Sequence, residues 1–467
     1  MSWSDLTPSK RCDWIDQLRG WAVIVMIEVH VVNVYLMKGL TPGWLNYVNG
    51  LVAPSFILCA GYSLVLSTFK PDGTLRPFLP TAKRLGFILF CAYLLHAPGL
   101  TLAEWTVLAT PQKLRELFKM DVLQCIAFSL LLLQGLARLM RKPGRYAIAA
   151  LVLALGAAWA APHLWKPGVA EGWWLPIRGL FNGNPDRGVT ALFPLFPWFA
   201  FAAFGSVLGA LYRHARVMPV EGKARWSEAQ WLAALALAGA AFVAWGRHAS
   251  KAWLWDGQWL EQDIYRLHNT TLPSVVERIG VVLLLGALLG GIERIRGRWR
   301  GPNLVEAASR ESLLLYMLHL FLMFGFLLAQ PIQALTGWRW YSQGWTGTLM
   351  ITVGIIAINL GAALVLQRLR ETPERLRKLQ KGALAALGVW FLAGGWITYV
   401  HFRRSPELAT EPYPFLNEAR VRKGLAPTED GLSRDPLEVV REKRRRGMRL
   451  KAEELRLLES QGHGTSQ

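Results

Sequence analysis

Residues 11–30 read Arg11-Cys-Asp-Trp-Ile-Asp-Gln-Leu-Arg19-Gly-Trp-Ala-Val-Ile-Val-Met-Ile-Glu28-Val-His30, an apolar segment interrupted by ionisable side chains. Arg19 and His30 stand eleven residues apart. That spacing is close to three helical turns, so both side chains lie on one face, roughly 16 Å apart along the axis. Ionisable groups at that depth of a bilayer are costly unless they are paired or line a polar cavity. The segment therefore predicts a membrane helix that borders a reaction site or a conduit.

The composition of the whole chain is typical of a membrane protein. Of its 467 residues, 52% are hydrophobic, only 18% are charged, and 22 are Trp. Apolar runs of about twenty residues recur along most of its length. The formal charge of +20 is concentrated in short connections between these runs, where Lys and Arg set membrane topology, so we expect no nucleic-acid partner. We predict an all-α polytopic membrane protein, a bundle of about 10–11 transmembrane helices with a short C-terminal tail.

The spans can be placed approximately along the chain. Basic residues gather in alternate connections, and the positive-inside rule then puts the N-terminus and the even-numbered connections in the cytoplasm. One transmembrane domain, 1–401, precedes a charged, partly helical tail, 402–467, which an odd number of spans sends outside. The expected spans are 15–37, 45–68, 83–99, 121–139, 146–165, 191–212, 230–246, 276–293, 311–330, 347–367 and 383–401.

The first span carries the strongest candidates for chemistry. Asp16, Arg19 and His30 share one side of the helix, while Glu28 points nearly opposite. Asp16 and Arg19 are one turn apart and can pair, which presents a guanidinium fork suited to phosphate or carboxylate. His30 can take a proton from an attacking hydroxyl or amine, or attack an acyl carbon itself; the alternative is a histidine hydrogen-bonded within the bundle. Glu28 either forms a buried ion pair with another span or takes part in the reaction.

A second polar cluster opens the ninth span. Arg310 stands at its cytoplasmic start, where it can meet a phosphate, and His319 lies about two turns deeper; Tyr316 belongs to the same cluster. Ser309 or Ser312 can cap this helix. A structural role for the cluster is equally compatible with the pattern.

Two more features mark possible walls of a site. His96 ends the third span, and Asp121 with Gln124 opens the fourth, so a polar acceptor arriving from outside can meet them; both are also ordinary helix-end residues. The sixth span begins Phe193-Pro-Leu-Phe-Pro-Trp198, where the prolines break or kink the helix and Trp198 is a candidate cavity wall. Further on, Gly205 and Gly209, four residues apart, predict a tight helix contact.

Several reaction classes lose support. The sequence contains no Gly-Lys-Ser/Thr phosphate loop, no His-Glu-x-x-His and no Gly-x-Ser-x-Gly. ATP-driven, metalloprotease and hydrolase functions are therefore disfavoured. The cysteines lack metal-ligand spacing, so we expect buried thiols and no metal; they are Cys12, Cys59, Cys91 and Cys125.

In several of these blocks the chain resembles bacterial members of the heparan-alpha-glucosaminide N-acetyltransferase catalytic-domain family. The resemblance covers about residues 10 to 370. The spacing of Arg19 and His30 is also similar to that in the acyltransferase-3 family of carbohydrate O-acyltransferases, but the block at 193–198 favours the first family. Animal members use a histidine in the loop after the first helix, which residues 31–44 lack. The matching blocks, in chain order, are 11–30, 53–61, 122–126, 193–198 and 315–319.

The resemblance implies an integral membrane acyltransferase of the bacterial inner membrane, with its N-terminus cytoplasmic. It would move an acyl group, in particular acetyl, from cytoplasmic acyl-CoA to a sugar amine or hydroxyl outside. The implied partners are acyl-CoA, a carbohydrate or glycan acceptor and the lipid bilayer, and a homodimer is left open. The implied catalytic residues are His30, Arg19, Asp16 and Asp121. The residues implied to contact CoA are Arg19, Arg84, Arg310, Tyr316 and Trp198. The residues implied to contact the acceptor are Glu28, His96, Gln124 and His319.

Two functions of other classes remain open. One is a transporter of an anionic or acyl-bearing solute, with Arg19 and His30 lining its path. The other is a catalytically silent scaffold. Binding of acyl-CoA separates the enzyme from both alternatives.

Overall fold

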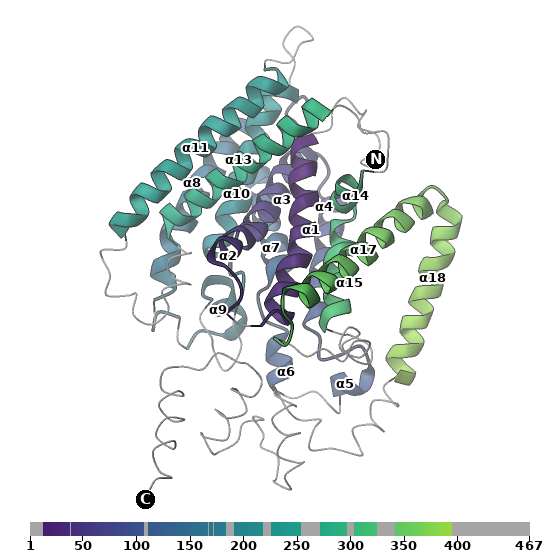
Figure 1. Ribbon diagram of the computed structural model, residues 1–467. Coiled ribbons are helices and arrows are strands. Elements are labelled where there is room, and N and C mark those ends of the chain that lie inside the picture. The colour runs from purple at the N-terminus through teal and green to yellow at the C-terminus, as the bar shows by residue number, and fades with distance from the viewer. Residues whose placement is uncertain are drawn as a thin grey trace, which may run out of the picture. The chain divides into compact units, whose positions relative to one another are not determined.

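The structure is a computed structural model, and within the residues it describes it is built of helices, with isolated β-bridges but no strand (Figure 1). Eight of these helices are long and apolar enough to cross a membrane, or nine if the bent pair described below counts as one span. The prediction of an all-α polytopic membrane protein is confirmed. The described residues are 13–37, 39–106, 111–166, 168–170, 172–183, 191–217, 226–253, 271–296, 303–324 and 341–394.

The helices follow the expected spans closely. The long spans are α1 (Asp13–Tyr35), α2 with α3 (Gly43–Asn49 and Val52–Thr68), α7 (Val122–Met140), α8 (Pro143–Leu164), α10 with the π-helix η3 (Leu195–Tyr212 and Arg213–Val217), α11 (Glu228–Trp253), α13 (Leu272–Arg296) and α17 (Trp345–Arg370). The expected third span is the 17-residue helix α4 (Leu79–Leu95). Shorter helices are α5 (Leu102–Thr106), α6 (Pro111–Glu116) and α9 (Leu175–Phe181).

The expected ninth and eleventh spans are described only in part. The ninth, expected from residue 311, coincides with α15 (Ser312–Phe324), which is preceded by α14 (Leu304–Arg310) across a 90° bend; residues 325–330 lie outside the described part. The eleventh begins within α18 (Pro373–Val389) and continues in the π-helix η4 (Trp390–Gly394). The remainder of that span, and the expected tail 402–467, also lie outside the described residues.

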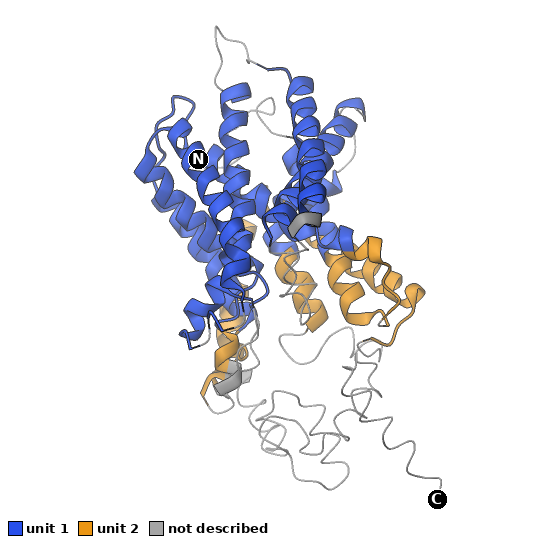
Figure 2. Cartoon of the chain, turned by 90° about the vertical axis from the view of Figure 1, so that its left-hand side faces the viewer, with its two compact units in different colours: residues 1–26, 47–96, 118–315 blue, residues 27–46, 97–117, 316–467 orange. Residues whose placement is uncertain are grey.

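The chain divides into two compact units, coloured separately in Figure 2. Unit 1 comprises residues 1–26, 47–96 and 118–315, and unit 2 comprises residues 27–46, 97–117 and 316–467. In unit 1, α10 packs against α3, α8 and α7, while α11 and α13 run side by side as a long pair (Figure 1). These contacts build the scaffold on which the polar residues of unit 1 are mounted.

Glycine permits the closest of these helix contacts. A Cβ atom on Gly205 of α10 would stand 2.1 Å from the carbonyl oxygen of Leu58, and one on Gly61 of α3 would stand 1.9 Å from the carbonyl oxygen of Ala202. The two backbones therefore touch directly, as small residues allow in membrane helices. A Cβ atom on Gly209 would likewise stand 2.7 Å from the carbonyl oxygen of Tyr62. The tight contact predicted for Gly205 and Gly209 is confirmed.

The start of α10 is kinked, as its prolines predict. Phe196 has a non-helical backbone, with φ −101° and ψ 112°, inside the span of this helix. The indole Nε1 of Trp165 donates a hydrogen bond to the carbonyl oxygen of Phe196 at 2.8 Å. A backbone group freed by the kink is thus satisfied by a side chain of the protein, which an apolar environment requires.

Unit 2 has its own apolar core, formed where the end of α1 meets α15 and α17. Ile27 and Val31 of α1 pack there with Met323, Ile351 and Ile355. The segment 341–343 closes the C-terminal end of α1, because the N–H groups of Tyr341 and Gln343 donate to the carbonyl oxygens of Val34 and Tyr35 at 2.8 and 2.9 Å. The last turn of α1 is therefore held by hydrogen bonds as well as by packing.

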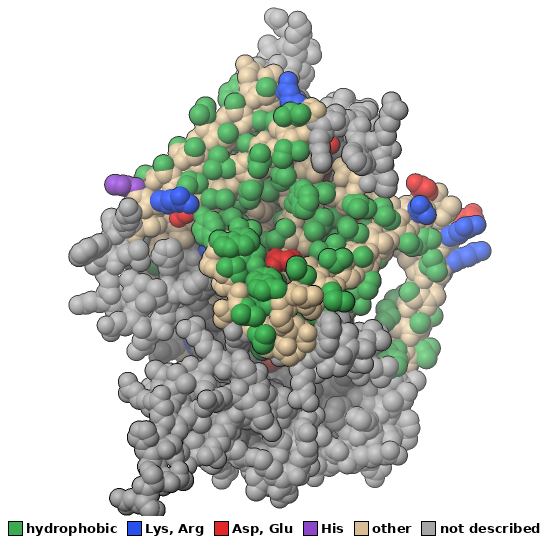
Figure 3. Space-filling model, in the orientation of Figure 1, with side chains coloured by type: hydrophobic (Ala, Val, Ile, Leu, Met, Phe, Trp, Pro, Cys, Tyr) green, Lys and Arg blue, Asp and Glu red, His purple; other side chains and the backbone are tan. Residues whose placement is uncertain are grey.

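Many large hydrophobic side chains of the described helices are exposed, and they spread over the described part of the face in Figure 3. They project from the same long helices that meet the length and hydropathy required of a membrane span. Contiguous apolar surface of this extent is expected where helices face lipid. Examples on α8, α13 and α17 are Ile148, Val152, Trp159, Leu288, Ile292, Met350 and Val353.

Candidate functional site

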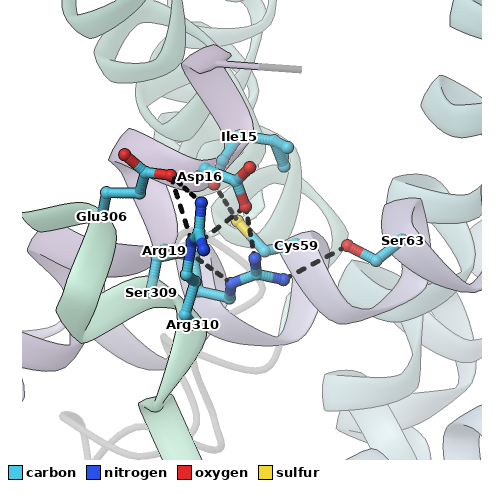
Figure 4. A network of polar contacts seen from close by, with 8 residues as sticks. All are labelled: Ile15, Asp16, Arg19, Cys59, Ser63, Glu306, Ser309 and Arg310. Carbon is cyan, nitrogen blue, oxygen red and sulfur yellow. Dashed lines mark hydrogen bonds and ion pairs between the residues drawn. The ribbon is translucent and has the colours of Figure 1, made fainter. Parts of the chain in front are cut away.

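In unit 1, Arg19 is the centre of a polar network (Figure 4). Its Nε donates to Ser309 Oγ at 2.9 Å, its Nη1 to Ser63 Oγ at 3.5 Å, and its Nη2 forms an ion pair with Asp16 Oδ1. The hydroxyl of Ser309 also donates to Asp16 Oδ1, at 3.3 Å. The predicted pairing of Asp16 with Arg19 is confirmed, and three nitrogens of the guanidinium are held in fixed directions.

The residue after Arg19 explains how α14 reaches this network. A Cβ atom on Gly20 would stand 2.1 Å from the carbonyl oxygen of Val305, so α1 touches the backbone of α14. The side chain of Asn303 begins α14 by accepting a hydrogen bond from the N–H of Glu306 at 3.0 Å. Ser309 lies inside α14 near its C-terminal end, and its hydroxyl bonds to Arg19 and Asp16.

Two further arginines were expected beside Arg19. Arg84 projects from α4 with an exposed side chain, close enough to Arg19 for their positive charges to interact. Arg310, on α14, is paired with Glu306 one turn earlier, with an Nε to Oε1 distance of 3.1 Å. Arg19, which is paired with Asp16, therefore has a second guanidinium group, that of Arg84, within range of its charge. This excess of positive charge suits an anionic ligand.

In unit 2, the structure brings together two histidines from separate polar clusters of the sequence. Nε2 of His319 on α15 lies 3.4 Å from Nδ1 of His30 on α1, and the ring centroids are 5.0 Å apart. The ring of Tyr316 contacts the ring of His319 edge-on, with a distance of 5.7 Å between the ring centroids and an angle of 89° between the ring planes. His319 is fully buried and Tyr316 nearly so, whereas His30 is partly exposed. No local sequence signal links positions 30 and 319, so only the packing of α1 against α15 could reveal this pair.

A third group, again in unit 1, joins α4 to the start of α7. His96 Nε2 lies 3.4 Å from Asp121 Oδ2, so the two predicted residues do meet. Asp121 caps α7, with its Oδ1 accepting from the N–H of Val122 at 2.7 Å. The amide of Gln124 accepts from the N–H of Asp121 and donates to the carbonyl oxygen of Ala92 on α4 at 3.2 Å. Gln124 therefore holds the two helices together, whereas its position in the sequence predicts a contact with the acceptor.

The charge state of Asp121 follows from these contacts. Burial disfavours the carboxylate, but His96 and the N–H of Val122 stabilise it more strongly, and the net effect lowers the pKa of Asp121. A carboxyl group whose pKa is lowered by folding stabilises the protein above its unfolded pKa. That contribution is lost as the pH falls through the folded value.

The replacement Asp121→Asn is therefore expected to destabilise the protein at neutral pH. The difference in stability between wild type and variant should become smaller as the pH is lowered. Asparagine still caps a helix, so the lost stability reports mainly the carboxylate. The thermal midpoints of wild type and variant should converge as the pH falls below about 4. A difference in midpoint that stays constant between neutral and acid pH would contradict this assignment.

The other expected site residues are placed as follows. Trp198, near the start of α10, lies in an aromatic cluster with Phe193 and Phe201, at centroid distances of 4.7 and 5.7 Å. Glu28 is half-buried on α1. Among the described residues, no group of three or more His, Cys, Asp or Glu side chains is arranged to hold a metal ion. The roles of Trp198 and Glu28 stay predictions.

Comparison with known protein families gives a match. Residues 11–250, just over half of the 467-residue chain, match the family described as "Heparan-alpha-glucosaminide N-acetyltransferase, catalytic". No curated protein matches the chain. The matched region contains Arg19, His30 and Asp121, whereas Tyr316 and His319 lie beyond it.

Proposed function

This chain belongs to the heparan-alpha-glucosaminide N-acetyltransferase catalytic family, and from that premise we propose that it transfers an acyl group from cytoplasmic acyl-CoA to a sugar outside. Family membership supports a multi-pass membrane enzyme of the acetyltransferase type. The donor, the sugar amine or hydroxyl that accepts the group, and the direction across the membrane are our proposal. The observation that carries it is the match over residues 11–250, which includes the helix with Arg19 and His30.

The polar network of unit 1 is proposed to hold the charged part of the donor. CoA carries phosphate groups, and a guanidinium fork binds phosphate through two parallel hydrogen bonds. Arg19 is held by Asp16, Ser63 and Ser309, so its fork is oriented before a ligand arrives. A phosphate would replace the Ser63 hydroxyl, which is a weaker acceptor, and bind across Nη1 and Nη2, while Asp16 and Ser309 keep the Nε side of the guanidinium in place. Arg84 adds the second positive charge.

His30 is proposed to handle the proton in the transfer step. The acceptor nitrogen or oxygen attacks the thioester carbonyl carbon and gives its proton to His30. The carbon–sulfur bond then breaks, and the departing thiolate of CoA receives that proton. The products are the acylated acceptor and CoA with a free thiol. Because α1 is one continuous helix, it carries a phosphate-binding and a proton-accepting residue three turns apart, roughly 16 Å along its axis.

The pair formed by His96 and Asp121 is proposed to orient the acceptor. Asp121 is fixed by its capping interactions, and it holds the imidazole of His96 in one direction. An imidazole held in this way can receive a hydrogen bond from a sugar hydroxyl or amine. The positive-inside rule predicts the extracytoplasmic side for this pair.

The proposal is tested by acyl-CoA turnover with the purified full-length protein in nanodiscs. We expect release of CoA from acetyl-CoA that depends on the acceptor, across a panel of amino sugars and glycans. N-acetylated versions of the same amino sugars, which lack a free amine, are the matched control for N-acylation. Absence of acyl-CoA binding and turnover, together with saturable flux of an anionic solute in proteoliposomes, would establish the transporter alternative instead.

Direct transfer and an acyl-histidine intermediate give different results in one additional measurement. Incubation with radiolabelled acetyl-CoA without acceptor should leave no label on the protein if the transfer is direct. Label that is retained on His30, and lost when the acceptor is added, would show that this side chain carries the acyl group.

A further inference from the structure

We propose that His319 is a positioning residue for His30, and that the two imidazoles share a hydrogen bond that sets which nitrogen of His30 accepts the proton. The proposal deepens the proposed acyl transfer and rests on it. Its basis is the 3.4 Å separation of His319 Nε2 and His30 Nδ1, with both side chains in unit 2. His319 lies outside the family match, so this role is read from the structure alone.

The chemistry of the step fixes the proton positions in the pair. For Nε2 of His30 to accept a proton from the acceptor, its Nδ1 must carry the ring hydrogen. That Nδ1–H then donates to Nε2 of His319, whose own hydrogen is on its Nδ1. When His30 becomes an imidazolium, its Nδ1–H still points at the lone pair of His319. The buried neutral ring therefore stabilises the positive charge that develops during the transfer.

This arrangement parallels the orienting carboxylate of a catalytic triad, with a neutral acceptor in its place. His319 is fully buried, and a carboxylate there would be a buried charge that must be compensated. A neutral imidazole provides the lone pair without that cost. A neutral imidazole also stabilises the imidazolium less strongly than a carboxylate would. We therefore expect His319 to contribute only a part of the rate acceleration that His30 provides as general base.

The packing around the pair holds the two rings in register. On α1, Ile27 and Val31 stand three residues before and one after His30, and both pack in the core of unit 2 with Met323. Met323 is one turn beyond His319 on α15. The ring of Tyr316 contacts His319 edge-on, one turn before it. Apolar contacts of the same two helices thus fix the separation of the imidazoles.

Three replacements of His319 separate the hydrogen bond from packing. The amide of glutamine reaches the position of Nε2 in histidine, whereas the amide of asparagine reaches only that of Nδ1. Leucine has a similar volume and no acceptor. We expect His319→Leu and His319→Asn to lower kcat by about tenfold to a hundredfold, a part of the 10²–10⁴-fold general-base effect. The KM for acyl-CoA should stay within about twofold, and His319→Gln should recover most of kcat.

A second measurement does not depend on turnover. Diethyl pyrocarbonate transfers a carbethoxy group to an unprotonated imidazole nitrogen, releasing carbon dioxide and ethanol, and mass spectrometry locates the product. We expect His30 to react several-fold more slowly in His319→Leu than in wild type and His319→Gln. Thermal midpoints of all variants serve as the folding control.

The outcomes distinguish the two levels of the proposal. Wild type without acyl-CoA turnover would overturn the proposed function, while the reagent experiment would still test the pairing. Wild-type turnover with equal kcat in His319→Leu and His319→Gln would overturn the positioning role and leave acyl transfer standing. A loss in His319→Leu that lies in KM instead of kcat would assign His319 to substrate binding.

Discussion

Replacing His30 by alanine is expected to lower kcat for acyl transfer by about 10²–10⁴-fold, because the proton acceptor of the reaction is lost. The KM for acyl-CoA should change little, since the proposed phosphate contacts are made by Arg19 and Arg84. Steady-state CoA release at saturating acceptor measures kcat and the KM for acyl-CoA. The ratio of kcat/KM between wild type and variant then gives the lost transition-state stabilisation.

A matched control is available on α8. His163 is an exposed histidine of a membrane span whose ring contacts only Trp159 among the aromatic side chains of the described residues, at 5.1 Å. His163→Ala removes an exposed imidazole from another membrane span, so its kcat should stay near that of wild type. If His30→Ala were as active as His163→Ala, the proton would have to go to another group, and our assignment of His30 would be wrong.

Replacing Arg19 by alanine should have two separable effects. Asp16 would lose its ion-pair partner, and we expect a loss of stability of about 1–3 kcal/mol. The expected loss is smaller than the loss on breaking a fully buried ion pair, because the side chains of Arg19 and Asp16 are 20% and 17% exposed. The proposed phosphate contact would also disappear, which should raise the KM for acyl-CoA by about tenfold to a hundredfold.

The double variant Arg19→Ala/Asp16→Asn distinguishes these effects. Neutralising Asp16 removes the uncompensated charge, so stability should largely return, while the KM for acyl-CoA should stay high. Recovery of both quantities would mean that Arg19 serves only to pair with Asp16. Arg247→Ala provides a control at another ion pair: the Arg247 side chain is 65% exposed, and its partner Glu277, 13% exposed, keeps a hydrogen bond from Tyr47, so we expect a smaller loss of stability than for Arg19→Ala and an unchanged KM.

The sequence by itself determined the features that depend on neighbours within one or two helical turns. Apolar runs of span length gave the all-α membrane architecture, because each run must satisfy its backbone internally. The i, i+3 spacing gave the ion pair of Asp16 with Arg19. The prolines at 194 and 197 gave the kink in α10, and the spacing of Gly205 and Gly209 gave its close contact with α3.

Only the tertiary structure decided which distant residues complete each group. Ser309 reaches Arg19 because α14 touches α1 at Gly20, and His319 reaches His30 because α15 packs against the end of α1. Gln124 is directed to Ala92 by the contact of α7 with α4. Each partner is separated by tens to hundreds of positions in sequence. Such pairings follow from helix rotation and crossing, which depend on side-chain shape along whole helices and leave no short sequence signal.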